Sequence, residues 1–437
     1  MTVDLFDKFN PVLEQCEQLP KDAHNPFSVC MDEVLSQTEA VIDGRRTILA
    51  GTNNYLGLTH NPEGIAAARD ALEAMGTGTT GSRVLNGTFA GHRKLESALA
   101  EFYGTKHAMV FSTGYQANLG TISTLAGPQD FILIDADCHA SIYDACRLGA
   151  ATVVRFRHND PADLDKRLRR LGKEKAAGKL VVVEGIYSML GDQAPLAELA
   201  EVTHKHGASL LVDEAHSLGV LGATGRGLAQ ETGVEGKVDF IVGTFSKSVG
   251  TIGGFCVSNH PKFDVLRLVC RPYMFTASLP PSVVASAISA LGQIPDPSLR
   301  SAVWGNAKRL AQGLTEAGFE LGAGNSPIVA VVIKTQEIAV RFWDLMLRSG
   351  VYVNLALPPA TPQGLNLLRC SLCAAHTAEQ IDTMIKVFVN VGHELGVLGT
   401  AEPSKISAGV ISGTPPSDAV AKTTANPSRR GVAAATG

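Results

Sequence analysis

Short runs of apolar residues alternate with longer amphipathic stretches from about residue 62 to about residue 290. The amphipathic stretches, such as 161–171 and 195–207, predict helices. The apolar runs are rich in β-branched residues and bounded by Gly, Asp or Ser, as strands buried on both faces of a sheet are. There are seven such runs, at residues 108–111, 131–135, 152–156, 180–185, 210–215, 239–244 and 253–258. Strands that alternate with helices over this length predict an α/β fold with a large, mostly parallel seven-stranded sheet.

The pattern differs at both ends of the chain. The first 50 residues predict an irregular or helical arm that ends in a hairpin-like stretch over residues 40–50. After about residue 290, a helix, a strand and a second helix predict a smaller C-terminal α+β domain. From Thr400 the chain is rich in Ala, Ser, Pro, Gly and Thr without periodicity, which predicts disorder. The expected organisation is an N-terminal arm, a large cofactor-binding domain, a small C-terminal domain and a disordered tail, at residues 1–55, 56–290, 291–397 and 398–437.

Composition narrows the class of protein. Apolar residues make up 45% of the 437 residues and charged residues 18%, which suits a well-buried enzyme. The net charge of −4 gives no general attraction to nucleic acid, and we expect at most peripheral contact with a membrane. The first residues lack the apolar segment of a signal peptide, and no run approaches the roughly 18 apolar residues of a membrane span. The eight cysteines are scattered, as in a reduced protein of the cytoplasm.

Three motif matches carry no function in this context. Gly76, Gly78 and Gly81 match the G-x-G-x-x-G pattern of dinucleotide binding, but they follow a predicted helix instead of a strand. Residues 213–216 spell DEAH, yet the chain has no phosphate-binding G-x-x-x-x-G-K-[ST] motif to accompany a helicase box. Residues 370–373 form a single C-x-x-C without a second pair, which favours packing over a metal site, so no metal is expected.

Polar groups follow four of the predicted strands, at the edge where open α/β sheets bind their ligands. In the segment 112–115, glycine lets backbone N–H groups at a helix N-terminus approach a phosphate. Asp213 can hold a pyridine nitrogen protonated, and His216 lies three residues further on. Lys247, beside small hydroxyl residues, is well placed to form an imine. Each of these polar groups taken alone, including the isolated His139, favours a structural role. Because one of them follows each of four strands, together they favour a site for a phosphorylated pyridine cofactor.

Several longer segments carry a resemblance to a known family. NNYLG, FSTGYQAN, DADCHASIYD, VVEGIYSMLGD, LVDEAHSLGVLGATGRG and GTFSKSVGTIGGF resemble the α-oxoamine synthase family of pyridoxal-phosphate (PLP) enzymes, over about residues 25–397. GSRVLNGT, VRFRHND and RPYMFTASLPPSV further resemble the soluble bacterial serine palmitoyltransferases of that family. The resemblance implies the type I fold of PLP-dependent transferases and an active homodimer.

The resemblance also implies how the cofactor would be held. Lys247 would bind PLP as an imine and later move the α-proton of the substrate. His139 would stack on the pyridine ring, Asp213 would pair with the ring nitrogen, and His216 would bond the phenolic oxygen. The remaining positions would hold the cofactor chiefly at its phosphate; they are Gly114, Tyr115, Thr244 and Ser246, with Thr276 of the partner subunit.

The implied reaction is a decarboxylating condensation of L-serine with a long-chain acyl thioester to 3-ketosphinganine, the first step of sphingolipid synthesis. Arg369 would bind the serine carboxylate, and Asn53 lies where family members contact substrate. Relatives carry Arg just before PPATP, where this chain has Leu357. Either a second carboxylate contact is missing or Leu357 lines the acyl channel.

Some alternatives stay open. Acyl chain length, and coenzyme A or acyl carrier protein as the donor, are not decided by the sequence. The alternative activity is that of a sister synthase, which uses glycine or alanine with another acyl-CoA, such as 2-amino-3-ketobutyrate ligase or 8-amino-7-oxononanoate synthase. Lys247 argues against a catalytically inactive regulatory subunit.

Overall fold

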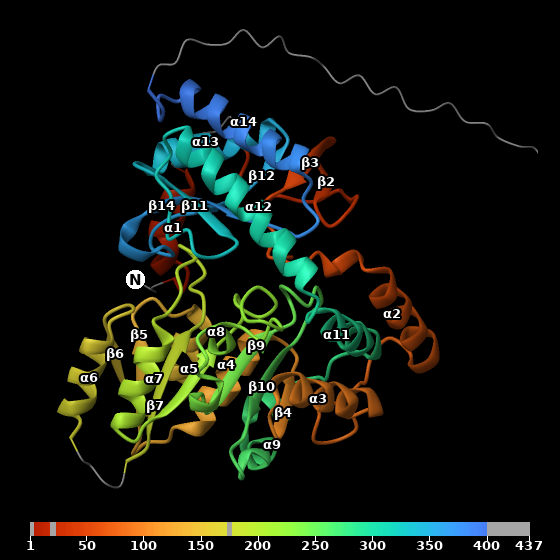
Figure 1. Cartoon of the computed structure of the whole chain (residues 1–437), viewed down its shortest axis with the longest axis vertical. Coiled ribbons are helices and arrows are strands. Elements are labelled where there is room, and N and C mark those ends of the chain that lie inside the picture. Colours follow the sequence, from red (N-terminus) through yellow and green to blue (C-terminus); the bar gives the residue numbers. More distant parts are fainter. Residues whose placement is uncertain (1–3, 18–22, 173–176, 400–437) are drawn as a thin grey trace, which may run out of the picture. The chain divides into compact units, whose positions relative to one another are not determined.

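A seven-stranded sheet is the central element of the fold (Figure 1), and its strands are the seven apolar runs of the sequence. In spatial order they are β4 (His107–Phe111), β10 (Gly254–Ser258), β9 (Phe240–Thr244), β8 (Ser209–Asp213), β7 (Lys179–Glu184), β5 (Phe131–Asp135) and β6 (Thr152–Phe156). The pairs from β9 to β6 are parallel, whereas β10 runs antiparallel to both of its neighbours. The predicted large, mostly parallel seven-stranded sheet is confirmed.

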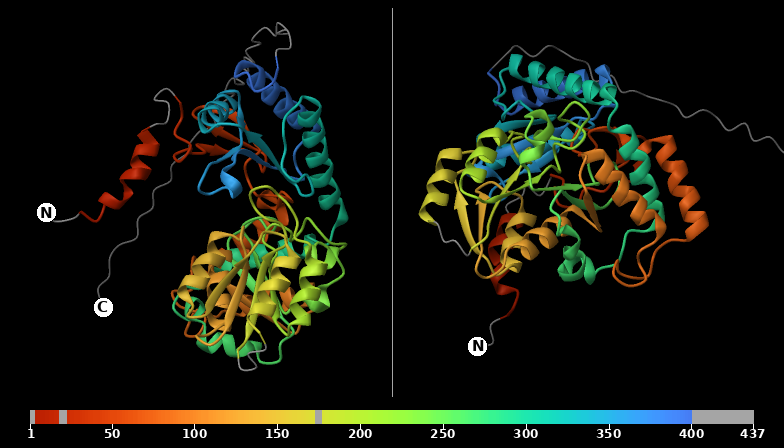
Figure 2. Two further views of the ribbon diagram at one scale, coloured as in Figure 1. Left: turned by 90° about the vertical axis from the view of Figure 1, so that its left-hand side faces the viewer. Right: turned by 60° about the horizontal axis from the view of Figure 1, so that its bottom comes forward.

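Helices pack on both faces of this sheet (Figure 2). The helix α4 (Gly114–Leu125) contacts β4, β9 and β10 and lies beside α5 (Ala140–Leu148). The helices α6 (Pro161–Arg170) and α7 (Leu196–Lys205) pack against each other. Because both faces are covered, the strands are continuous apolar runs, and all five residues of β9 and of β10 are buried.

Three further helices pack together beside β4 of the sheet. The helix α11 (Pro281–Gln293) packs on α2 (Pro62–Met75) and on α3 (Ala90–Tyr103). The glycine-rich stretch that begins at Gly76 follows α2, so the dinucleotide-binding context is absent there. The short helical segments in this half of the chain are η2 (Leu58–His60), α8 (Leu228–Glu231), η3 (Glu235–Lys237), η4 (Phe263–Val265), α9 (Leu266–Val269) and α10 (Arg271–Met274).

Two smaller sheets lie with the last helices. The antiparallel sheet β11 (Ile328–Ile333), β14 (Asn366–Ser371) and β13 (Asn354–Ala356) accompanies α12 (Pro297–Glu316), α13 (Gln336–Arg348) and α14 (Ala378–Glu394). The sequence pattern predicted β11, α12 and α13, but not β13, β14 or α14. The other segments there are β12 (Val351–Tyr352) and η5 (Pro362–Gly364).

The second small sheet contains the hairpin predicted over residues 40–50. It has the order β1 (Glu33–Val34), β2 (Glu39–Ile42), β3 (Arg45–Leu49) and β12. Asp43 and Gly44 join β2 to β3 with φ angles of 49° and 71°, the left-handed geometry that an Asp-Gly two-residue hairpin turn needs. The arm before it contains η1 (Asp7–Phe9) and α1 (Asn10–Glu17).

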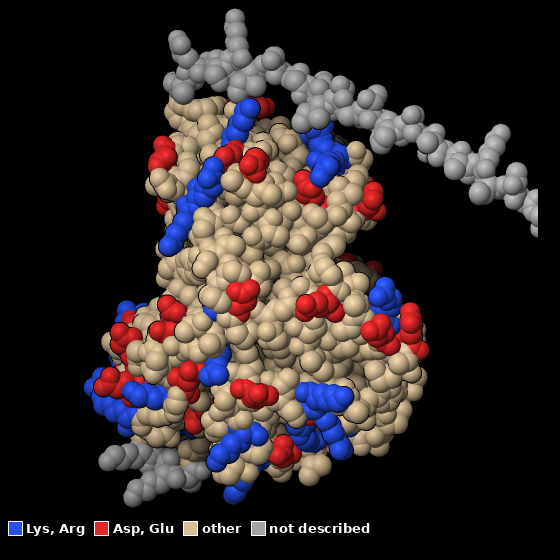
Figure 3. Space-filling view, turned by 45° about the vertical axis from the view of Figure 1, so that its right-hand side comes forward, with Lys and Arg blue, Asp and Glu red and all other residues tan. Residues whose placement is uncertain are grey.

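The structure, a computed structural model, describes residues 4–17, 23–172 and 177–399. The predicted tail therefore lies outside the described residues from Thr400 on, and the division into arm, large domain and small domain stays a prediction. No described helix is long and apolar enough to span a membrane. On the face in Figure 3, Lys and Arg side chains lie among Asp and Glu side chains instead of forming one basic patch.

Candidate active site

The predicted cofactor residues meet in one cavity at the carboxyl ends of the strands of the large sheet. This cavity has a volume of about 350 Å³. Its walls come from the starts of α4 and α5 and from the ends of β7, β8 and β9. Eight predicted positions line it: Gly114, Tyr115, His139, Asp213, His216, Thr244, Ser246 and Lys247.

Asp213, the last residue of β8, is held on both of its carboxylate oxygens. Its Oδ2 accepts a hydrogen bond of 2.6 Å from Asn118 Nδ2 on α4, and its Oδ1 accepts one of 2.9 Å from the backbone N–H of Ala215. Asn118 also bonds Ser141 Oγ, at 3.0 Å, and Ser141 Oγ lies 2.8 Å from His139 Nδ1. These bonds fix the orientation of the carboxylate and of the imidazole at the cavity wall.

Sequence reasoning missed a second buried acid, Glu184. It ends β7 directly beside Asp213, since the two residues pair across β7 and β8. Its carboxylate accepts a hydrogen bond from the backbone N–H of His139. Burial raises the pKa of Glu184 well above its ordinary value, and the charge of Asp213 adds to the effect. The sequence signal was an acid at a strand end, as for Asp213.

Lys247 follows β9, and the pKa of its amine lies near the neutral range. Burial lowers the pKa of Lys247 to about 8; Asp213 and Glu184 oppose the shift, and Arg369 adds to it. A lysine with this pKa has a substantial neutral fraction in mildly alkaline solution, and only the neutral amine can attack a carbonyl group.

The two histidines of the cavity are neutral at physiological pH. Burial lowers the pKa of His139, and it lowers the pKa of His216 well below its ordinary value, with Lys247 adding to both shifts. The Tyr55 hydroxyl lies 2.8 Å from His216 Nδ1 and 3.5 Å from Asn53 Oδ1, and burial raises the pKa of Tyr55, so this hydroxyl keeps its proton. Sequence reasoning did not single out Tyr55.

Hydroxyl groups and a helix N-terminus gather at one end of this cavity. Thr244 Oγ1 lies 2.8 Å from Ser246 Oγ, and α4 begins at Gly114. A Cβ atom on Gly114 would lie 2.6 Å from Thr244 Cβ, so only glycine permits this close approach of α4 and β9. Unpaired backbone N–H groups in the first turn of a helix, beside small hydroxyls, form an anion-binding site.

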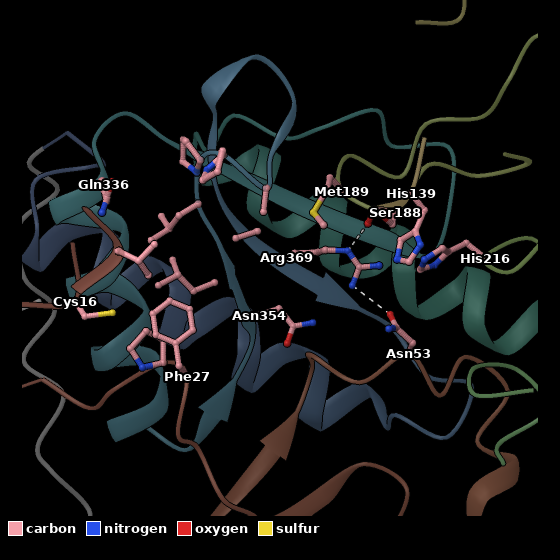
Figure 4. Close-up of a pocket in the computed structure, with 18 of the residues that line it drawn as sticks. Cys16, Phe27, Asn53, His139, Ser188, Met189, His216, Gln336, Asn354 and Arg369 are labelled. Carbon is pink, nitrogen blue, oxygen red and sulfur yellow. Dashed lines mark hydrogen bonds between the residues drawn. The ribbon is translucent and has the colours of Figure 1, made fainter. Parts of the chain in front are cut away.

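A second cavity of about 550 Å³ adjoins the first, and His139, His216 and Lys247 line both of them. Figure 4 shows these histidines on one side of Arg369, and Phe27, Cys16 and Gln336 on the far side. Several apolar side chains line the cavity: Val12, Phe27, Met189, Leu355 and Leu357. Lys247 therefore lies between the smaller cavity, which holds Asp213 and the hydroxyls of Thr244 and Ser246, and the larger one, which holds Arg369.

Both predicted substrate residues lie in this second cavity. Arg369, on β14, donates from Nε to the Ser188 carbonyl oxygen at 2.5 Å and from Nη1 to Asn53 Oδ1 at 3.2 Å (Figure 4). A further bond of 2.7 Å joins Arg369 Nη1 to Ser371 Oγ. The guanidinium is thus fixed at the cavity wall, and these three bonds leave its Nη2 group as the remaining donor.

Thr276 is the one predicted cofactor residue that lines neither cavity. Its Oγ1 accepts a hydrogen bond of 3.1 Å from Gln116 Nε2 on α4. Cys370 and Cys373 are buried free thiols, and no group of three or more metal-ligand side chains occurs in the part of the chain that the structure describes.

Comparisons with known proteins identify the family to which this chain belongs. The family model of class I and II aminotransferases matches residues 46–388. Serine palmitoyltransferase of Caulobacter vibrioides is 60% identical over 92% of this chain and 98% of its own length, and that of Sphingomonas paucimobilis is 56% identical over 91% and 95%. An 8-amino-7-oxononanoate synthase of Geobacter metallireducens is 38% identical over 83% and 93%. The larger identity therefore lies with the serine palmitoyltransferases.

Solved structures give the same result. The structure of Sphingomonas wittichii serine palmitoyltransferase matches with a TM-score of 0.89 and 58% identity, over 91% of this chain and 100% of that one. A high-resolution structure of serine palmitoyltransferase with PLP matches with a TM-score of 0.89 and 55% identity, over the same shares. The type I fold expected from the sequence resemblance is confirmed.

Proposed function

Because this chain belongs to the class I and II aminotransferase family and its most similar relatives reported above are bacterial serine palmitoyltransferases, we propose that it is a PLP-dependent serine C-palmitoyltransferase. It condenses L-serine with a long-chain acyl thioester, with loss of carbon dioxide, to 3-ketosphinganine. The observation that carries the proposal is the position of Lys247, between the smaller cavity, which holds Asp213, Thr244 and Ser246, and the larger cavity, which holds Arg369.

The residues of the smaller cavity fit PLP. Asn118 lines this cavity, and its Oδ1 is buried without a hydrogen-bond partner among the described residues, as a polar atom at a ligand site can be. When bound, PLP links to an amino group and draws electrons from its α-carbon. Thr244, Ser246 and the first backbone N–H groups of α4 would bind the phosphate, since they supply hydrogen-bond donors and the positive end of a helix dipole.

The acids and histidines would hold the ring. Asp213, oriented by Asn118, would bind the protonated ring nitrogen, because a buried carboxylate at that atom keeps it charged. His139 would stack on the ring, and His216 would donate from Nε2 to the phenolic oxygen. Glu184 would act on His139 only through the backbone bond that it accepts.

Lys247 would move the proton of the substrate. With its amine free, Lys247 has a pKa that burial lowers to about 8. A base works best when its pKa lies near the working pH, so Lys247 Nζ can take the α-proton of serine and return a proton later.

The second cavity would bind both substrates. Arg369, with Asn53 beside it, would bind the serine carboxylate, and the apolar walls around Phe27 and Leu357 would enclose the acyl chain. Burial of the acyl chain against these apolar side chains contributes about 0.8 kcal/mol per methylene group to its binding. This favours long acyl chains over short ones.

The active unit would be a homodimer, in which Thr276 of the partner subunit reaches the phosphate. In its own chain Thr276 lines neither cavity and lies in a segment with exposed apolar side chains, Leu268 at 70% and Phe275 at 71%. Such a surface is typical of a protein contact. We also propose a cytoplasmic location, with which eight free thiols agree.

The proposal is tested by following the absorbance of the PLP-loaded protein during titration with L-serine, glycine and L-alanine. We expect L-serine to change the spectrum at the lowest concentration. The Lys247→Ala variant should fold but bind PLP without a covalent link, and it should not turn over. A response to glycine or alanine in place of serine would instead identify a sister synthase.

A further inference from the structure

The VRFRHND segment, which the proposed mechanism leaves without a role, places His158 between two carboxylates. His158 Nδ1 lies 2.8 Å from Asp135 Oδ1, at the end of β5, and His158 Nε2 lies 2.7 Å from Asp192 Oδ2, in the loop between β7 and α7. Asp135 is fully buried and Asp192 is 18% exposed. One imidazole ring thus joins two loops that are far apart in the sequence.

This geometry requires a charged ring. Ionised carboxylate oxygens only accept hydrogen bonds, so both ring nitrogens of His158 must donate. Burial alone would lower the pKa of His158, but the hydrogen bonds to Asp135 and Asp192 outweigh it and raise that pKa to about 10. The other groups that face the ring are Asp137 Oδ2, 3.8 Å from Nδ1, and the Tyr187 ring, whose centroid lies 4.5 Å away.

The first of the two loops leads to His139. Asp135 accepts further bonds from the backbone N–H groups of Asp137, at 2.9 Å, and Asn159, at 2.8 Å. Asp135 therefore fixes the start of the 136–139 segment, whose last residue lines both cavities.

The second loop carries a contact of Arg369. A turn from Tyr187 to Asp192 is closed by two backbone bonds, from Tyr187 N to the Asp192 carbonyl at 2.9 Å and from Gly191 N to the Tyr187 carbonyl at 3.0 Å. Within this turn lies Ser188, whose carbonyl oxygen accepts the bond from Arg369 Nε. Asp192 anchors the turn to His158.

We infer that His158 is a positioning residue: as an imidazolium it clamps the loop of His139 to the turn of Ser188, and through Ser188 it sets the direction of Arg369. The part of this inference that concerns serine rests on the proposed function. The clamp itself is a property of the fold and can be measured without substrate.

The first test compares His158→Gln with a matched control, His206→Gln, by amide hydrogen exchange of the PLP-loaded protein. His206 also bonds a carboxylate, Asp165 Oδ1 at 2.9 Å, but this pair joins α6 to the end of α7 and involves neither loop. In His158→Gln we expect residues 185–193 and 136–142 to exchange about tenfold faster or more, with residues 328–333 unchanged. The control should match the wild type at both loops. Unchanged exchange at both loops in His158→Gln would overturn the inference.

A second variant covers the case in which His158→Gln does not fold. Asp192→Asn removes one charge of the clamp and leaves the pair of His158 with Asp135. We expect faster exchange over residues 185–193 only, and exchange equal to wild type over both loops would again overturn the inference.

The link to Arg369 has its own readout. In His158→Gln the KM for serine should rise about tenfold while kcat changes less, and this loss should not add to the loss in Arg369→Ala, because both act on one contact. Full additivity would contradict a role through Arg369. A wild-type protein that does not respond to serine would refute the proposed function, whereas the clamp would still be decided by hydrogen exchange.

Discussion

At the scale of single residues, burial sets the reactivity of the groups around Lys247. Desolvation keeps His139 and His216 neutral and brings the amine of Lys247 close to neutral pH. At pH 7, about a tenth of a lysine with a pKa of about 8 is neutral, against less than about one part in a thousand at its ordinary pKa. Burial of Lys247 thus raises its reactivity.

This predicts how PLP loading depends on pH. Protein stripped of PLP should take up the cofactor faster as the pH rises, with the half-maximal rate near the Lys247 pKa of about 8, since only the neutral amine reacts. The rate is measured by the growth of the imine absorbance after mixing. A midpoint near the ordinary lysine pKa of 10.5 would show that Lys247 is solvated and not desolvated.

A second prediction concerns Leu357, which lines the cavity of Arg369. If serine lacks a second carboxylate contact, Leu357→Arg should strengthen serine binding by roughly ten- to a hundredfold, the worth of a charged hydrogen bond of about 1.5–3 kcal/mol. Leu355→Arg, which adds the same charge at another position of this cavity, is the control and should not strengthen binding. Serine titration of the three proteins decides between the hypotheses. Unchanged serine affinity with poorer use of long acyl chains would support the acyl-channel hypothesis.

At the scale of elements, the strands that are buried on both faces were the most predictable. Most of them are continuous apolar runs, and the sequence located these together with the partly exposed edge strand β6, whose run TVVRF is rich in β-branched residues. β14 was missed because its run NLLRCS is polar at both ends and in the middle, and these polar residues are buried by tertiary contacts. β13 was missed because a strand of only three residues is too short to show a pattern.

The partners of the site residues were not predictable for a similar reason. Asn118 lies within a helix, which marks no function by itself, and Glu184 ends a strand as Asp213 does, but its role depends on which strand lies beside it. Asn118 reaches Asp213 because α4 packs against the sheet, and Glu184 adjoins Asp213 because β7 pairs with β8. Such contacts join residues 95 positions apart in the sequence, as for Asn118 and Asp213, and a single sequence does not record them.

The close approach of α4 to β9 yields a prediction at this scale. In Gly114→Ala the new Cβ would lie 2.6 Å from Thr244 Cβ, so the helix start or the end of β9 must shift. Overpacking of this kind costs about 1–3 kcal/mol, and we expect PLP to bind roughly tenfold more weakly or worse. PLP affinity is measured by equilibrium titration of the stripped protein. Gly305→Ala, where a Cβ meets no atom within 4 Å, is the control; equal PLP affinity in both variants would contradict a tight cradle at Gly114.

At the scale of the whole molecule, the proposed site needs two chains. We expect light scattering of the PLP-loaded protein to give a mass of twice 46.0 kDa, since Thr276 of the partner subunit would complete the phosphate site. Phe275→Asp, which places a charge on the exposed apolar surface beside Thr276, should lower both the dimer fraction and PLP affinity. A fully active species of 46.0 kDa would show that one chain suffices.

The central claim is that the chain joins L-serine to a long-chain acyl thioester with loss of the serine carboxyl carbon. The most direct test is mass spectrometry of the product formed from L-serine, labelled at that carbon, and thioesters of graded acyl length on coenzyme A or acyl carrier protein. We expect unlabelled 3-ketosphinganine from the palmitoyl thioester, with the label in carbon dioxide. A product that retains the label, or one that forms from glycine or alanine but not from serine, would contradict it.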